Sequence, residues 1–194
     1  MSDRTPCKEC DASILLSTSE RTGGFCMPCK NGYRKNIEES KKYYAKEKEL
    51  NEICPFRALW RELMDKVYNK ESGFNGLSDK EKLYYTVSVF CSEIYNGGFI
   101  QYFDNSSGEH YLYAEKGLIN LNAVYSLKLL HQAKEELFGK DNVPTDRTKR
   151  CNYTQQSVVG LKLNELDTEF YKDLDDLDNK LEVFAIHANL VQNV

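Results

Sequence analysis

Apolar side chains recur at intervals of three and four residues along most of the chain beyond residue 54. Three series carry this pattern: Phe56, Leu59, Trp60, Leu63 and Val67; Leu83, Val87, Phe90 and Ile94; and Leu118, Leu121, Tyr125 and Leu129. Such intervals place side chains on one face of an α-helix, and the alternation typical of strands is almost absent. Residues 54–194 therefore predict a mainly α domain, a compact helical bundle of about five to seven helices.

The longest apolar series lies near the end of the chain and predicts one amphipathic helix. It consists of Leu163, Leu166, Phe170, Leu174, Leu177, Leu181 and Phe184. Residues 164–182 also hold eight acidic side chains, most of them expected on the exposed face: Glu165, Asp167, Glu169, Asp173, Asp175, Asp176, Asp178 and Glu182. Two interpretations stay open: an ordinary solvated face, or an acidic interface for a basic protein partner.

The first 53 residues have a different pattern. Residues 1–33 are rich in Cys, Gly, Ser and Thr and lack the large apolar side chains that a core requires. Residues 34–53 are almost all charged or polar helix formers, which predicts a charged connecting helix. A partly disordered linker is the alternative for this stretch. We therefore expect three parts, 1–33, 34–53 and 54–194.

The cysteine spacing predicts a metal site in the first part. Cys7 and Cys10 form one Cys-x2-Cys pair, and Cys26 and Cys29 form a second pair after 15 intervening residues. This spacing is typical of a four-cysteine zinc site, in which two knuckles complete a tetrahedron of thiolates. Four protein ligands leave no open coordination position, so the expected cofactor is a structural Zn²⁺ in a zinc-ribbon or knuckle module.

Charge and composition narrow the class of protein. The chain lacks an apolar leader and any run of 18 apolar residues, and reduced cysteines suit a metal site, so we expect a cytoplasmic protein without membrane association. The net charge is +1 over residues 1–53 and −5 over residues 54–194, which speaks against a broad nucleic-acid-binding face. The bases that follow the last ligand, Lys30, Arg34, Lys35, Lys41 and Lys42, are interleaved with glutamates. Contact with DNA or RNA through the zinc module is therefore the alternative function.

A polar corner is predicted in the middle of the chain. At Asn96-Gly97-Gly98 a helix should end, because glycine accepts a positive φ, and a new turn should start with Phe99 on an aromatic face. The polar candidates around this corner are Glu93, Asn96, Gln101, Tyr102 and Asn105. They could form a ligand site or an active site around Glu93 and Asn96. The preferred interpretation is a network that satisfies backbone at a helix break.

The run from Asn96 to Asn105 resembles the hallmark of a family of bacterial DNA-mimic proteins and their relatives. Further matches are the helix around Leu129 to Ala133, the turn from Pro144 to Arg147, and Asp167 with Tyr171. The resemblance covers about residues 56–187 and leaves the cysteine pairs outside. It implies a helical fold, a binding role without known catalysis, a DNA-binding protein as partner, and a homodimer as one oligomeric state.

Catalysis by Cys91 with His110 or His131 is not expected, because Cys91 lies on an apolar helical face where a buried thiol is inert. We therefore predict that the chain is not an enzyme. We predict a protein-interaction module with a structural zinc site that binds a basic partner through an acidic surface, as a regulator or an immunity-type protein.

Overall fold

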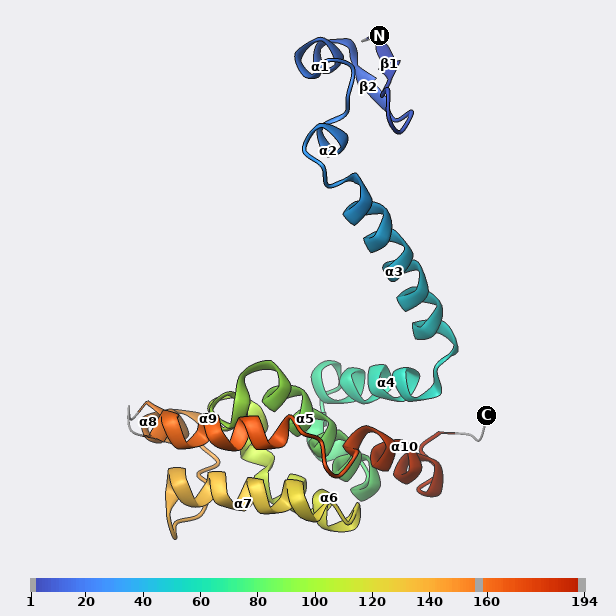
Figure 1. Ribbon diagram of the computed structural model, residues 1–194. Coiled ribbons are helices and arrows are strands. Elements are labelled where there is room, and N and C mark those ends of the chain that lie inside the picture. The colour runs from blue at the N-terminus through green and yellow to red at the C-terminus, as the bar shows by residue number, and fades with distance from the viewer. Residues whose placement is uncertain (1–2, 156–158, 192–194) are drawn as a thin grey trace. The chain divides into compact units, whose positions relative to one another are not determined.

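The computed structural model describes residues 3–155 and 159–191, and the chain divides into two compact units, Met1–Cys54 and Pro55–Val194 (Figure 1). Both units are mainly helical, with one short sheet near the N-terminus, which confirms the predicted fold class. Among the helices in the described residues, none is long and apolar enough to cross a membrane.

The first unit begins with a hairpin and two short helices. Strands β1 (Arg4–Pro6) and β2 (Ser13–Leu15) pair antiparallel, with Thr5 opposite Ile14. Helix α1 (Leu16–Thr22) ends at Gly23, whose φ of 73° is left-handed, and α2 (Met27–Lys30) follows. In the described part of this unit, Ile14 is the one buried apolar side chain besides three cysteines. Hydrophobic burial of this size is too small to hold a folded module, as the composition predicts.

Helix α3 (Arg34–Ile53) completes the first unit and corresponds to the predicted connecting helix. None of its residues is buried, so packing against a core does not explain its formation. Ion pairs between successive turns support it instead, such as Arg34 with Glu38 at 3.4 Å and Lys35 with Glu39 at 3.7 Å. The structure therefore favours the helix over the disordered linker.

The second unit contains seven α-helices in the residues that are described, within the predicted range. They are α4 (Pro55–Asn69), α5 (Asp79–Asp104), α6 (Tyr111–Asn120), α7 (Val124–Phe138), α8 (Arg147–Thr154), α9 (Val159–Phe170) and α10 (Leu177–His187), with 3-10 turns η1 (Gly73–Gly76) and η2 (Ser106–His110). Helix α5 is central, since α4, α6, α8, α9 and α10 all contact it (Figure 1). Its side chains Phe90, Ile94, Phe99 and Phe103 are completely buried in the core.

A capping box sets the start of α5. Ser78 caps the helix by accepting the N–H of Glu81, and the Glu81 carboxylate accepts the N–H of Ser78 at 2.8 Å. The same carboxylate pairs with Lys66 at 2.6 Å, which ties α4 to α5. This capping box fixes where the longest helix of the unit begins.

The prediction of one amphipathic helix from Leu163 to Phe184 is wrong. Helix α9 ends at Phe170 and α10 begins at Leu177. Between them Asp173 and Asp176 adopt left-handed φ values of 46° and 51°, and the Asp173 carboxylate accepts the N–H of Leu177 at 3.2 Å. An aspartate that accepts an N–H at the start of the next helix, as Asp173 does, competes with helix continuation. Leu174 therefore does not join the apolar stripe and is 64% exposed.

Candidate functional site

The four predicted zinc ligands converge in the first unit. The Sγ atoms of Cys7, Cys10, Cys26 and Cys29 all lie within 4.8 Å of one another, and no pair of them forms a disulfide. Three of these side chains are buried and Cys10 is half-buried. A tetrahedron with Zn–S bonds of about 2.3 Å has S–S edges of about 3.8 Å. The separation of 3.7 Å between the Sγ atoms of Cys10 and Cys26 fits such a site.

Backbone hydrogen bonds hold the two knuckles together. Asp11, with a left-handed φ of 55°, closes the first knuckle by donating its N–H to Cys7, and Lys8 donates its N–H to Gly24 beside the second knuckle. The N–H of Cys26 donates to the Sγ of Cys7 at 3.2 Å, and this bond is the main cause that lowers the pKa of the Cys7 thiol to about 6. Amide donors of this kind stabilise thiolates, the form in which cysteine binds a metal.

The structure adds Arg34 to this cluster. Its Nη2 lies 3.0 Å from the Sγ of Cys26, and contact with Cys26 and then Cys29 raises the pKa of the guanidinium. Sequence reasoning grouped Arg34 with the bases that could touch nucleic acid. Its position at the first turn of α3 was the available signal, because that turn directly follows the second knuckle. The positive charge of Arg34 lies against the Cys26 sulfur, where it offsets the negative charge of a thiolate.

The Asn-Gly-Gly segment is a sharp kink inside α5, which confirms the predicted helix break. Gly97 has φ −163° and ψ 22°, and Gly98 has φ 75° and ψ −175°. The φ of Gly98 is one that side chains with a Cβ rarely adopt, and a Cβ there would overlap the carboxylate of Asp167. Gly98 is therefore required by backbone conformation and by close packing together.

Two side chains from the region of α9 satisfy the backbone on both sides of the kink. Asp167 accepts the N–H of Phe99 at 2.8 Å, and Tyr171 donates its hydroxyl to the carbonyl of Ile94 at 3.2 Å. Burial raises the pKa of Asp167, while the bond from Phe99 acts in the opposite direction. Asp167 thus belongs to the kink and not to an exposed acidic face.

The polar candidates of the corner separate into two groups. Glu93 accepts hydrogen bonds from Gln101 at 2.7 Å, from Asn105 at 2.8 Å and from Ser107 at 3.4 Å. Asn96 is exposed and lies outside this network. Tyr102 is buried, and its hydroxyl has no hydrogen-bond partner among the described residues. The Glu93 carboxylate is thus used by three neutral donors of its own unit, which is a structural arrangement.

Sequence reasoning missed Arg150, the largest completely buried side chain of the described residues. Its guanidinium donates to the carbonyls of Phe103, Asn105, Pro144 and Thr145, all at 2.7 to 2.8 Å. Burial lowers its pKa. These bonds satisfy carbonyls at the C-terminal end of α5 and fasten the loop before α8. No local pattern distinguishes this arginine from the surface bases beside it.

Half of the eight acidic candidates have structural partners. Besides Asp167 and Asp173, Glu169 accepts from Tyr125 and Lys172, both at 2.5 Å, and Asp175 accepts the N–H of Ser126 in the first turn of α7 at 2.7 Å. The expectation that most of the eight are exposed is therefore wrong. The four exposed members are Glu165, Asp176, Asp178 and Glu182.

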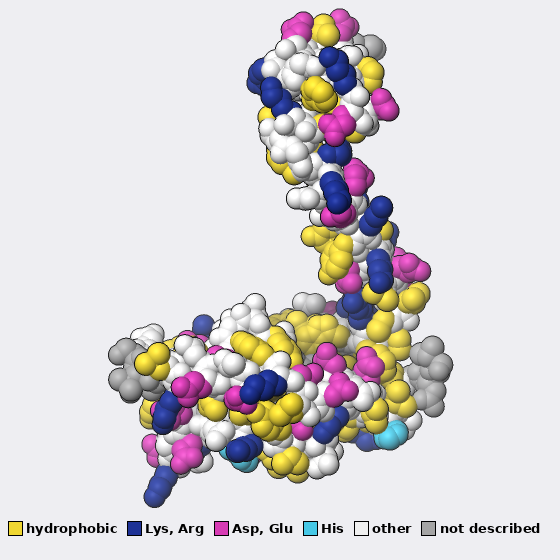
Figure 2. Space-filling view, viewed as in Figure 1, with side chains coloured by type: hydrophobic (Ala, Val, Ile, Leu, Met, Phe, Trp, Pro, Cys, Tyr) yellow, Lys and Arg dark blue, Asp and Glu magenta, His cyan; other side chains and the backbone are white. Residues whose placement is uncertain are grey.

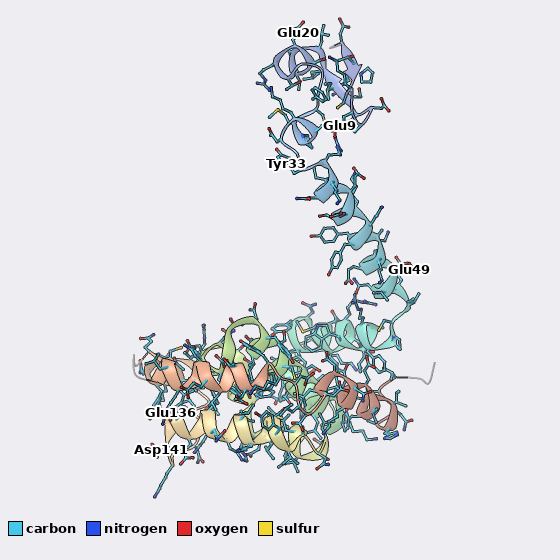
Figure 3. The ribbon with its side chains drawn as sticks, in the orientation of Figure 1. Glu9, Glu20, Tyr33, Glu49, Glu136 and Asp141 are labelled. Atoms are coloured by element: carbon cyan, nitrogen blue, oxygen red, sulfur yellow. The ribbon has the colours of Figure 1, made fainter. Side chains whose placement is uncertain are left out.

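Glu165 lines a groove of about 450 Å³ between α7 and α9. Glu135 and Glu136 of α7 line its other side, and Figure 3 labels Glu136. Lys162 forms an ion pair with Glu136 at 2.5 Å. The groove is therefore lined by three acids and one base, which gives it an acidic balance.

Comparison with protein families matches residues 75–189 to the family described as DMP19-like protein. The matched range contains the kink, the Glu93 network, Arg150 and the acidic residues, and it leaves the cysteine cluster outside. Neither the curated proteins nor the solved structures gave a match to the chain.

Proposed function

The chain belongs to the DMP19-like protein family, and from this premise we propose that it is a non-catalytic interaction protein that binds a basic, DNA-binding protein. In this proposal it acts in the cytoplasm as a regulator or an immunity-type protein. The family is one of DNA mimics, so a partner that normally holds DNA is the partner class that the membership favours.

The observation that carries the proposal is the set of unpaired acids on the second unit. Glu165, Asp176, Asp178 and Glu182 are exposed, and no ion pair joins any of them to another described residue. Residues 54–194 carry a net charge of −5. None of the four makes a hydrogen bond or ion pair within the described residues, and Asp178, in the first turn of α10, is placed to favour a helix. Charge left without a partner steers the approach of a basic protein.

The absence of catalysis in this proposal rests on how the reactive groups are used. Glu93 is occupied by amide and hydroxyl donors. Burial raises the pKa of the Cys91 thiol, which keeps it protonated. His110 stacks on Phe74 with ring centroids 3.7 Å apart.

A zinc ion in the first unit is the second part of the proposal. Cys7, Cys10, Cys26 and Cys29 would hold it, with Arg34 against the thiolates. Zinc held by four thiolates supplies a structural cross-link, which this module needs because its apolar core is so small.

Contact with nucleic acid through the zinc module remains the alternative, and the charges of α3 rank it lower. Arg34 contacts Cys26 and Glu38, Lys35 pairs with Glu39, and Lys41 pairs with Glu38 at 3.1 Å. Three of the five bases named from the sequence are thus held by acids or thiols, which interrupts a positive strip for phosphates.

Affinity capture tests the proposal. The full chain is immobilised, proteins are captured from its source cells at about 50 mM salt and released at about 300 mM salt, and the released proteins are identified. We expect one or more basic DNA-binding proteins whose DNA complex is dissociated by added chain in an electrophoretic mobility assay. If only acidic or neutral proteins are retained, or if the chain itself shifts the DNA, the proposal is wrong.

A further inference from the structure

Two exposed tyrosines form a stacked pair on the second unit. The rings of Tyr95, on α5, and Tyr171, directly after α9, have centroids 5.9 Å apart and planes inclined by 19°. They are 50% and 48% exposed, and Leu174, three residues further along the chain than Tyr171, is 64% exposed. We call these three residues the tyrosine platform.

The platform is rigid although it is exposed. The Tyr171 hydroxyl is bound to the carbonyl of Ile94, and the Tyr95 ring packs edge-on against the buried Phe170 at 5.5 Å. Rings that are fixed before binding lose little conformational freedom when a partner covers them. Both tyrosines thus touch the fold on one side and leave about half of their surface exposed on the other. Rigid aromatic side chains exposed in this way are typical of interface anchors.

Negative charge borders the platform. Asp173 is half-buried and follows Tyr171 by two positions, and Asp178 is exposed in the first turn of α10. Partial burial raises the pKa of the Tyr95 phenol to about 12, and Asp173, Cys91 and Asp178 act in the same direction. Figure 2 shows hydrophobic, acidic and basic side chains next to one another on the face that carries α9 and α10. Asp173 accepts the N–H of Leu177, whereas Asp178 has no hydrogen bond or ion pair within the described residues. An apolar platform beside these two carboxylates fits a partner group that is both flat and cationic.

We propose that Tyr95, Tyr171 and Leu174 anchor the partner, and that the partner lays an arginine side chain on the tyrosine rings beside Asp178. A guanidinium is planar, stacks on aromatic faces and pairs with carboxylates, whereas the ammonium of lysine stacks less well. This inference rests on the proposed function and names the group that the partner presents.

Charge excludes the other occupants of the same surface. A nucleic acid would stack bases on the rings but would bring its phosphates against Asp173 and Asp178. A second copy of the chain docked through the same face would bring its own Asp173 and Asp178 against these carboxylates. An arginine side chain of a basic protein can stack on the tyrosine rings and pair with the neighbouring carboxylates at the same time.

The test compares short synthetic peptides, one rich in arginine and one in which lysine replaces each arginine, binding to the full chain in calorimetric titrations. We expect the arginine peptide to bind more tightly. Tyr95→Ala combined with Leu174→Ser should weaken it about five- to tenfold, the range expected for loss of one cation–π contact and its apolar border. Tyr95→Phe should bind like the wild type, because it keeps the ring.

The matched control is Tyr44→Ala combined with Leu161→Ser, since both side chains are exposed, at 70% and 75%, and lie outside the platform. Thermal unfolding establishes that both double variants fold. Equal affinity of wild type and platform variant, or equal affinity for the two peptides, would overturn the inference. The partner protein identified by affinity capture separates the two proposals. If the platform variant still binds that partner fully, the role of the platform is refuted while the proposed function stands.

Discussion

The carboxylate of Asp167 accepts the backbone N–H of Phe99 at 2.8 Å, across 68 positions of the chain. Phe99 is the first residue after the Gly97-Gly98 kink, where a new helical segment starts and its N–H groups lack acceptors within the helix. Asp167 therefore caps this segment from another helix. The relationship explains why an aspartate in α9 and a glycine pair in α5 serve one feature of the fold.

The first prediction follows from this contact. Gly98→Ala places a Cβ against Asp167 at a positive φ, so it should lower the free energy of unfolding by more than about 1 kcal/mol. Asp167→Ala should cost about 1–2 kcal/mol through the lost cap. Urea denaturation measures both, with Gly160→Ala as the control, because Gly160 lies in open space on α9. Losses no larger than those of the control would contradict the role of the kink.

The sequence and the structure agree where the signal is local. The four cysteines from Cys7 to Cys29 are close along the chain, so their spacing alone predicts the cluster. The kink depends on the backbone conformation that Gly98 can adopt, so it can be predicted from that residue itself. Asp167 and Arg150 form hydrogen bonds with backbone groups about 50 to 70 positions away along the chain. The spacing of apolar and polar residues carries no information on such long-range pairs, so they could not be predicted. Apolar side chains also keep their spacing of three and four residues through the turn at Leu174. The break between α9 and α10 was therefore not predicted.

The second prediction concerns metal content. Protein purified without added metal should contain about one zinc per chain by elemental analysis, because four thiolates form one tetrahedral site. Cys26→Ser should lose the zinc and unfold residues 3–33, while the second unit keeps its helical circular dichroism because it has its own core. A zinc content near zero in a reducing preparation would refute the site.

The third prediction separates Arg34 from the other bases of α3. Arg34→Gln removes the cation that touches Cys26, so a chelator should extract zinc at about tenfold lower concentration. Lys35→Gln is the control, since Lys35 is exposed and pairs with Glu39 instead. Equal zinc retention in the two variants would make Arg34 a plain surface base. Competition with a chromophoric chelator measures the difference.

The fourth prediction uses His110, whose pKa is lowered by burial against Phe74, with Arg150 acting in the same direction and Glu109 opposing it. Below pH 6.5 the unfolded chain binds this proton more readily than the folded chain, so stability is lost as the pH falls below that value. His110→Phe should keep the stack and reduce the loss between about pH 7 and about pH 5. His131→Gln is the control, and an unchanged pH dependence in His110→Phe would contradict the prediction.

The fifth prediction distinguishes acids that hold the fold from acids that are free to bind. Asp175 accepts the N–H of Ser126 with its side chain only 10% exposed, so Asp175→Ala should cost about 1 kcal/mol by uncapping α7.

Replacing Glu165, Asp176, Asp178 and Glu182 by their amides should leave thermal stability unchanged or raise it slightly, because like charges repel and these side chains have no partner in the described part of the chain. The same four changes should slow association with a basic partner and flatten its dependence on salt, since they remove the charge that steers the encounter. Stopped-flow rates at low and high salt decide the point. Association as fast as in the wild type at both salt concentrations would leave these four acids as solubilising surface.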